Sequence, residues 1–193
     1  MNPSARTTLG LFTSIPTLLA VLSVLLLSIP VLATGPNGAA APRLCDFDSL
    51  PGTTSNVETA IAEIQTLALT LNKPRENISE KIENAIGSLQ HSLTMTGVEA
   101  MEDYEEAVRR LQQLNKKTKN LFQTPLCRVV QIAATAATDA YGLAILANPQ
   151  SENVLRAANQ ISKASDDLAD ANFDAALDHY KKALKFALAA LAE

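Results

Sequence analysis

From residue 56 to the end of the chain, apolar side chains recur every three or four positions, the spacing of one face of an α-helix. The pattern occurs six times, and Pro, Gly or Asn separates the repeats. We therefore predict six amphipathic helices. The expected buried faces are, in chain order, Val57, Ile61, Ile64, Ala68 and Leu71; Ile78, Ile82, Ile86, Leu89 and Leu93; Met101, Tyr104, Val108, Leu111 and Leu114; a wide arc over 128–147; Leu155, Ala158, Ile161 and Leu168; and Phe173, Leu177, Tyr180, Leu184, Leu188 and Leu191.

Capping and breaking residues predict where these helices begin and end. Side chains such as Ser and Asn accept hydrogen bonds from the first N–H groups of a helix, whereas Pro and Gly interrupt one. The expected boundaries are Ser55 or Asn56 and Pro74 for the first helix, Asn77 before the second, Gly97 before the third, Pro125 opening the fourth, Ser151 before the fifth, and Asn172 with Asp174 at the sixth. Short connections favour antiparallel neighbours. The predicted fold is an all-α, up-and-down bundle of about six helices.

The fourth predicted helix differs from the others because its apolar arc covers most of its circumference. Its only charges over 128–147 are Arg128 and Asp139. A helix of this kind is normally central and touched on several sides. Its many alanines would let neighbours approach closely, or would leave a cavity for an apolar ligand.

The N-terminal 33 residues have the pattern of a secretory signal peptide. Arg6 precedes a long apolar run, and small or modest residues follow Pro30 up to Ala33. We expect a signal peptide over 1–33, a flexible linker over 34–55 rich in Gly and Pro, and a helical domain over 56–193. The run is also long enough to span a bilayer, so an uncleaved membrane anchor is the alternative.

The two cysteines allow one intramolecular disulfide, between Cys45 and Cys127. Disulfides persist in oxidising compartments, which an exported chain would enter. Two free thiols or an intermolecular bridge remain open alternatives. Neither cysteine has a nearby histidine in the sequence, and no Cys-x-x-Cys is present, so catalytic thiol chemistry is not expected.

Composition and charge narrow the class of partner. Hydrophobic residues make up 47% of the chain but aromatics only 4%, so Ala and Leu dominate the apolar share, as helices favour. The formal net charge is −4. Binding to nucleic acid needs clustered Lys and Arg, so we expect no nucleic-acid partner. The two basic stretches, 109–119 and 181–185, are explained as complements to the negative ends of helices.

The chain carries no convincing catalytic or metal-binding motif. Five carboxylates over 166–178 are scattered by a helix break, and the acidic run 102–106 is typical of an exposed helix start. His91 and His179 have no second ligand at metal-binding spacing. We therefore expect no enzyme activity, no metal and no cofactor. Asn77-Ile78-Ser79 matches the acceptor pattern for N-glycosylation, which is meaningful only in a eukaryotic host.

Two weak internal patterns accompany the helices. A shift of 72 residues superposes Val57 on Val129 and Met101 on Phe173, which would fit two three-helix units, but 72 residues are also 20 helical turns. The segment 172–184 resembles the second helix of a tetratricopeptide repeat, with Ala176, Tyr180 and Ala183 at its small–aromatic–small spacing. The resemblance covers about 13 residues and implies no binding residues.

These observations predict an exported, non-catalytic helical module that is structural or binds an unidentified extracytoplasmic protein. It would be secreted, periplasmic or at the cell surface, and would meet a membrane only if the N-terminal segment stays attached. The alternatives are a carrier of a small apolar ligand in the bundle core and a protein inhibitor of a secreted enzyme. Plant invertase and pectin-methylesterase inhibitors are disulfide-tied bundles of this sort, but they carry a cysteine hairpin that this chain lacks.

Overall fold

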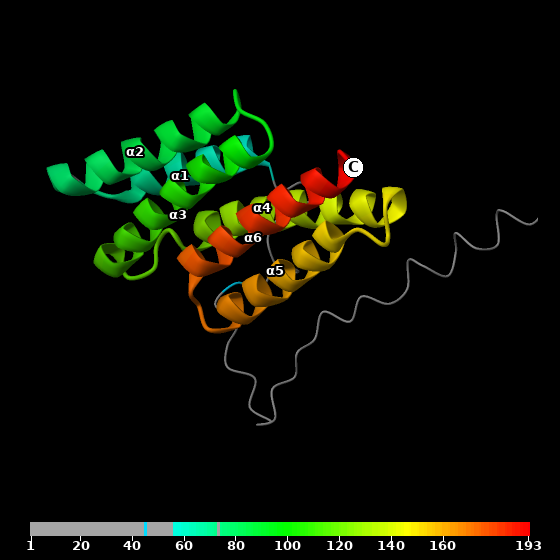
Figure 1. The fold of residues 1–193 in the computed structure, drawn as a ribbon. Helices are drawn as coiled ribbons and strands as arrows, with labels where there is room; N and C mark the ends of the chain where they lie inside the picture. The colour runs from blue at the N-terminus through cyan, green and yellow to red at the C-terminus, as the bar shows by residue number, and fades with distance from the viewer. Residues whose placement is uncertain (1–44, 46–55, 73) are drawn as a thin grey trace, which may run out of the picture. The chain divides into compact units, whose positions relative to one another are not determined.

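The computed structural model describes residues 45, 56–72 and 74–193, which belong to a compact unit, Pro42–Glu193. The predicted signal peptide lies outside these residues, as does the predicted linker apart from Cys45. The described residues form six helices and no strand, which confirms the all-α prediction (Figure 1). In chain order they are α1 (Val57–Thr70), α2 (Glu76–Ser92), α3 (Val98–Thr118), α4 (Gln123–Ala147), α5 (Glu152–Ala169) and α6 (Phe173–Leu191).

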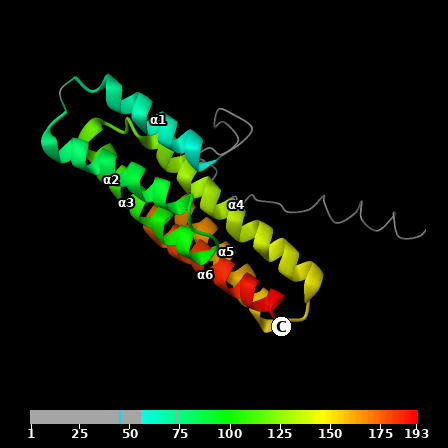
Figure 2. The ribbon, with the colours of Figure 1, turned by 90° about the horizontal axis from the view of Figure 1, so that it is seen from above.

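Consecutive helices pack as antiparallel neighbours. The pairs α2–α3 and α5–α6 form close hairpins, and α3 joins them by packing on both α4 and α6. α4 contacts α1, α3, α5 and α6, so it is the most connected helix, as its apolar sequence predicts. Figure 2 shows α1 alongside the first half of α4. The fold is the predicted up-and-down bundle.

Side-chain caps set the start of two helices as predicted. Asn56 Oδ1 accepts the backbone N–H of Thr59 at 2.8 Å and begins α1. Ser151 Oγ accepts the N–H of Asn153 at 3.1 Å and begins α5. Each bond satisfies one of the N–H groups that the first turn of a helix leaves without a partner. α2 begins at Glu76, two residues earlier than predicted.

Two predicted boundary roles are wrong. Pro125 is the third residue of α4 rather than its opening residue. Its missing N–H costs nothing there because first-turn N–H groups have no partner inside the helix. Asn172 does not cap α6 with its side chain, and its amide instead donates to Asp167 Oδ1 at 3.3 Å.

The first half of α4 lies in the core and carries a buried ion pair. Arg128 is fully buried, and its Nε and Nη2 atoms donate to the two carboxylate oxygens of Glu63 at 2.9 and 2.6 Å. This two-pronged geometry is the strongest form of a cation–carboxylate contact. Because Glu63 lies on α1, the pair holds α1 against α4. A lone buried charge would be costly, so each partner depends on the other.

α4 and α6, which pack on each other, both bury several alanines. Small side chains let two helix backbones approach closely, and both helices bury alanines at three- and four-residue spacing. The packing of two alanine-rich helices on each other favours close packing over an internal cavity. The buried alanines are Ala133, Ala137, Ala140 and Ala144 on α4, and Ala176, Ala183, Ala187 and Ala190 on α6.

Cys45 and Cys127 form the predicted disulfide. Their Cα atoms lie 5.4 Å apart, and the bond joins residues separated by 82 positions. The amide of Gln123 lies against the bond, with Nε2 3.2 Å from Cys127 Sγ and 3.8 Å from Cys45 Sγ. The intramolecular pairing thus replaces the two alternatives that the sequence left open. A disulfide fits an oxidising compartment.

α5 packs Ile161 and Leu168 of the predicted face against the core, but it does not bury Leu155. Val154, Ala157 and Ala164 are buried, whereas Leu155 is 67% exposed. Val154 and Leu155 are adjacent and differ by only 100° around the helix, so the apolar periodicity fits either phase. Close packing against alanine-rich α6 favours the phase that presents small side chains.

The two halves of the bundle do not pack alike. α1 contacts α2 and α4 but makes no comparable contact with α3 among the described residues. α4, which would correspond to α1 in a duplicated unit, packs extensively on α6. The tetratricopeptide-like positions Ala176, Tyr180 and Ala183 are all buried, as expected for a helix-packing motif.

Candidate interaction surface

Six of the seven large apolar side chains exposed by the described residues lie at one end of the bundle, where α2, α4 and α6 end and α3 and α5 begin. In Figure 1 the ends of α4 and α6 and the start of α5 lie on the right, near the marked terminus, and the turn between α2 and α3 lies nearer the middle. The seventh, Leu69, lies in the last turn of α1 at the opposite end. We call the six residues the leucine end: Leu93, Leu143, Leu146, Leu155, Leu188 and Leu191.

The exposure of this end differs from what the apolar periodicity predicts. Leu93, Leu155, Leu188 and Leu191 were expected on buried faces and are instead 40–67% exposed. Each belongs to the first or last turns of its helix or to the residue that ends it, where fewer neighbouring helices remain to cover it. Periodicity predicts the face of a helix but not how far along that face a neighbour extends.

Direct contacts hold the helix ends at this surface together. The side-chain amides of Asn148 and Asn153 donate to the carboxylate of Glu193 at 3.1 and 2.6 Å, which joins the α4–α5 turn to the end of α6. On the other side of α6, a methyl group placed on Gly97 would lie 3.6 Å from Leu188 Cδ1. The turn between α2 and α3 therefore also borders this end. Gly97 has a φ of 60°, a conformation that favours glycine.

The second half of α4 presents an apolar stripe to solvent. Leu143 and Leu146 are 59% and 77% exposed, and Asp139 lies one turn before Leu143 on the same side of the helix. α1 begins at Val57 and lies beside the first half of α4 (Figure 2), so it does not cover this stripe. By length and composition α4 could cross a membrane, and 33% of its most apolar 18-residue window is buried inside the bundle.

Acidic side chains surround the leucine end. The segments that form it, 90–103, 139–156 and 185–193, hold six carboxylates and two basic side chains, a net charge of −4 with His91 neutral. Asp139, Glu99 and Glu102 are exposed and make no ion pair within the described part of the chain. Glu152, in contrast, pairs with Arg156. The end therefore combines exposed leucines with a negative rim.

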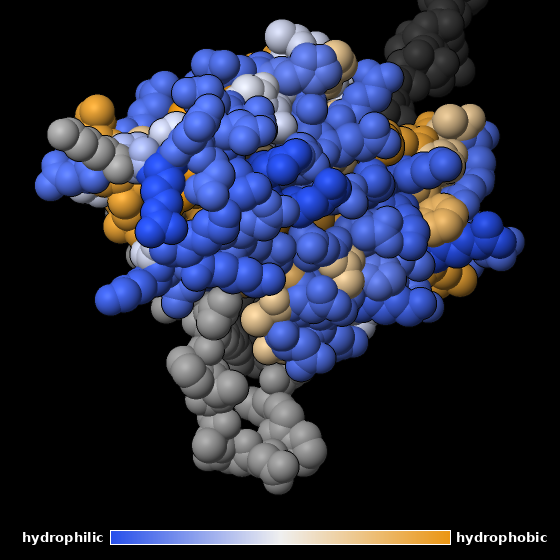
Figure 3. Space-filling view, turned by 90° about the vertical axis from the view of Figure 1, so that its left-hand side faces the viewer, coloured by the Kyte–Doolittle hydropathy of each residue, from blue (hydrophilic) through white to orange (hydrophobic). Residues whose placement is uncertain are grey.

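The opposite end of the bundle is mostly hydrophilic, as Figure 3 shows for the left-hand side of Figure 1. Lys116 and Lys117 lie in the last turn of α3, where cations complement the helix dipole as the sequence predicts. A surface hollow of about 540 Å³ lies at this end beside Arg75 and Lys117. The two ends thus differ in polarity.

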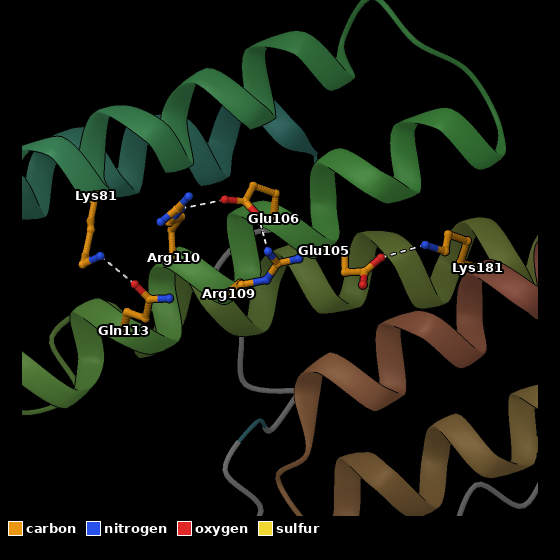
Figure 4. Close-up of polar contacts among 7 residues, drawn as sticks. All are labelled: Lys81, Glu105, Glu106, Arg109, Arg110, Gln113 and Lys181. Carbon is orange, nitrogen blue, oxygen red and sulfur yellow. Dashed lines mark hydrogen bonds and ion pairs between the residues drawn. The ribbon is translucent and has the colours of Figure 1, made fainter.

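Contacts within α3 and to its neighbouring helices engage the charged side chains of α3 (Figure 4). Arg109 and Arg110 both contact Glu106, at 2.8 and 2.6 Å. Glu105 accepts from Lys181 of α6 at 2.8 Å. On the other flank, Lys81 of α2 donates to Gln113 Oε1 at 2.6 Å (Figure 4). Glu106 therefore pairs within α3 and Glu105 pairs with α6, so these two carboxylates form ion pairs rather than an acid–base pair.

Each histidine bridges a helical hairpin. His91 Nδ1 lies 2.8 Å from Asp103 across α2 and α3. His179 lies 2.6 Å from Gln160 and 3.4 Å from Asp167 across α5 and α6. The five aspartates of 166–178 do not gather, and no group of three His, Cys, Asp or Glu side chains able to hold a metal occurs among the described residues.

Burial and ion pairing perturb four titratable groups. Burial raises the pKa of Tyr104 and of Tyr180. Burial also raises the pKa of Asp174, while nearby Arg109 acts to lower it. The hydrogen bond to Glu105 raises the pKa of Lys181. Each perturbed group lies in a helix–helix contact, and the causes are those of packing.

A second surface hollow lies between α1 and the start of α4. It has a volume of about 370 Å³ and is lined by Glu63 with threonines and apolar side chains of both helices. Like the hollow beside Arg75, it lies at the edge of α1 rather than between α4 and α6. Neither hollow is the core pocket that a carrier of an apolar ligand was expected to have.

Comparisons with known proteins give this chain no relative. No protein-family model, curated protein or solved structure matches it. The leucine end, with its acidic rim, is therefore identified from the residues and their geometry alone, and it is the candidate functional surface.

Proposed function

We propose that this chain is an exported, non-catalytic helical module that binds another protein outside the cytoplasm through the leucine end. The observation that carries the proposal is the gathering of six exposed leucines at one end of the bundle. Exposed apolar side chains are ordinary when scattered, but a concentration of them is typical of an interaction surface. The segregation is strong, since only Leu69 is exposed elsewhere among the described residues.

Export is supported by two independent features. The N-terminal pattern of residues 1–33 is that of a signal peptide. The Cys45–Cys127 disulfide fits an oxidising compartment. Mass spectrometry of the protein purified from its source should find a first residue at Thr34. An intact chain from Met1 in the cytosolic fraction would contradict export.

A binding role is also supported by the way the charged groups are used. Glu105 and Glu106 form ion pairs within the bundle, and the buried Glu63–Arg128 pair joins two helices. Such contacts stabilise the fold, so they account for these charged groups. The exposed leucines of the leucine end have no such role within the fold. An inhibitor of a secreted enzyme would be one kind of protein-binding module of this sort.

The test is a pull-down from extracytoplasmic extract with three forms of the full chain. We expect the wild type to capture a specific protein that the Leu146→Glu, Leu155→Glu double variant loses. Leu69→Glu is the matched control, because Leu69 is 86% exposed but lies at the other end. Circular dichroism should show that all three forms are equally helical. Capture that is equal in all three, or no specific capture at any salt concentration, would refute the proposal.

A further inference from the structure

The stripe on α4 combines leucines with a carboxylate that has no ion pair within the described residues. Asp139, Leu143 and Leu146 occupy positions i, i+4 and i+7, which lie within about 60° of one another around a helix. All three are exposed. A partner that covers both leucines also approaches the carboxylate, which lies about 6 Å along the axis from Leu143. The stripe therefore presents an apolar contact and a negative charge together.

The charge around this stripe distinguishes among possible occupants. The leucine end carries six carboxylates and two basic side chains. A second copy that docked through the same surface would bring two such negative rims together. An anionic bilayer would be repelled in the same way. A partner with basic residues around its apolar contact would be attracted, since complementary charges favour association and like charges oppose it.

From this charge pattern we propose that the occupant of the leucine end is an amphipathic helix of another protein, with Lys or Arg flanking its apolar face. An α-helix presents side chains at the same i, i+4 and i+7 spacing as the stripe, so leucines and a base on the partner can face the leucines and Asp139. Leu155, in the first turn of α5, extends the apolar contact across the α4–α5 turn. This inference rests on the proposed function and names the chemistry of the partner.

Two synthetic peptides test the inference on the full, disulfide-bonded chain. One is an amphipathic helix of roughly 14 residues made of Leu and Lys, and the other has Glu in place of Lys. Fluorescence anisotropy would measure both affinities at about 50 mM and about 500 mM NaCl, because salt screens exposed charges. At low salt we expect the Leu/Lys peptide to bind at least about ten-fold more tightly than the Leu/Glu peptide. This preference should shrink at high salt.

Variants locate the contact. Asp139→Asn should weaken Leu/Lys binding about three-fold, and Leu146→Glu should weaken it about ten-fold. Two controls at the other end, Asp166→Asn and Leu69→Glu, should leave affinity unchanged because both side chains are exposed but distant. Circular dichroism should show that Asp139→Asn leaves the helical content unchanged. If Asp166→Asn weakens binding as much as Asp139→Asn, the attraction is general and the proposed site is wrong.

Two further measurements separate the other occupants. Light scattering after size exclusion would reveal a dimer, and flotation with vesicles of phosphatidylglycerol and phosphatidylcholine would reveal membrane binding. Either result, if abolished by Leu146→Glu, would overturn the inference in favour of a second copy or a membrane. Equal binding of the two peptides would also overturn it. In any of these cases, the extract pull-down tests the proposed function separately. If the Leu146→Glu, Leu155→Glu variant still fails to capture the partner, the proposed function holds, and only the inference of a basic helical partner is wrong.

Discussion

The disulfide gives the sharpest stability prediction. Cys45→Ala together with Cys127→Ala removes a cross-link between residues separated by 82 positions. In the chain-entropy model the cross-link restrains the unfolded chain and not the folded one, and a loop of this length corresponds to about 4.5 kcal/mol at 25 °C. For a domain of this size each kcal/mol corresponds to a few degrees, so the melting temperature should fall by roughly 10–18 °C.

Urea denaturation followed by circular dichroism measures this loss. The double variant and the wild type reduced with dithiothreitol should lose similar free energy of unfolding, since both release the same loop. Reduction leaves both cysteine side chains in place, so it controls for the packing of Cys127, which is buried. The dependence of that free energy on urea concentration should also steepen, because an unlinked unfolded chain exposes more surface.

A small effect would refute this reasoning. If reduction lowers the free energy of unfolding by less than about 1 kcal/mol, the bond does not restrain the unfolded chain as the entropy model requires. If the double variant loses much more than the reduced wild type, the packing of the two side chains is the larger contribution. Either result would distinguish the contribution of the disulfide bond from that of the packing of the two side chains.

Three further predictions concern an ion pair with a buried arginine, a buried hydrogen-bond acceptor and a carboxyl group with a raised pKa. Glu63→Ala leaves the buried charge of Arg128 without its carboxylate, and urea titration should show a loss of about 3 kcal/mol; a loss below about 1 kcal/mol would contradict the pairing. Asn115→Ala removes the Oδ1 acceptor of the Phe122 N–H, a 2.8 Å bond at the α3–α4 turn, and should cost about 1–2 kcal/mol in the same assay, whereas no change would contradict its role. The raised pKa of Asp174 means that the folded state holds the carboxyl proton more tightly than the unfolded chain does. The protonated carboxyl group therefore contributes to stability below the ordinary carboxyl pKa. This contribution is lost as the pH rises through the raised value. Asp174→Asn should remove that loss, so the variant should gain stability relative to wild type between about pH 3 and pH 7. A difference in free energy of unfolding between variant and wild type that stays constant over this range would contradict the raised pKa.

The helices themselves could be predicted from the sequence because their signals are local. Asn56 and Ser151 cap helices where the sequence places caps, and Gly97 separates α2 from α3. A cap acts within three residues, and an apolar stripe repeats within one or two turns. Such signals do not depend on what the helix later contacts, so all six helix starts lie within two residues of the predicted positions. Two roles differ from the prediction, since Pro125 lies inside the first turn of α4 and the side chain of Asn172 does not cap α6.

The sequence limits the internal disulfides to one possible pair but does not show whether that bond forms. Two cysteines allow a single internal bond, but whether their sulfurs meet depends on where α4 lies relative to Cys45. The 5.4 Å between their Cα atoms is a property of the folded chain. The ion pair of Glu63 with Arg128 had no sequence signal either, because the two residues are 65 positions apart.

The candidate surface could not be predicted from the sequence, because exposure depends on the lengths of neighbouring helices. The sequence by itself determined six amphipathic helices and the wide apolar arc of α4, since side chains at helical spacing need only their own helix to share a face. Only the tertiary structure decided that α1 stops short of covering Leu143 and Leu146, and that α5 turns Leu155 outward. Burial is a property of pairs of helices, and a stripe of leucines looks the same in sequence whether a neighbour covers it or a partner must.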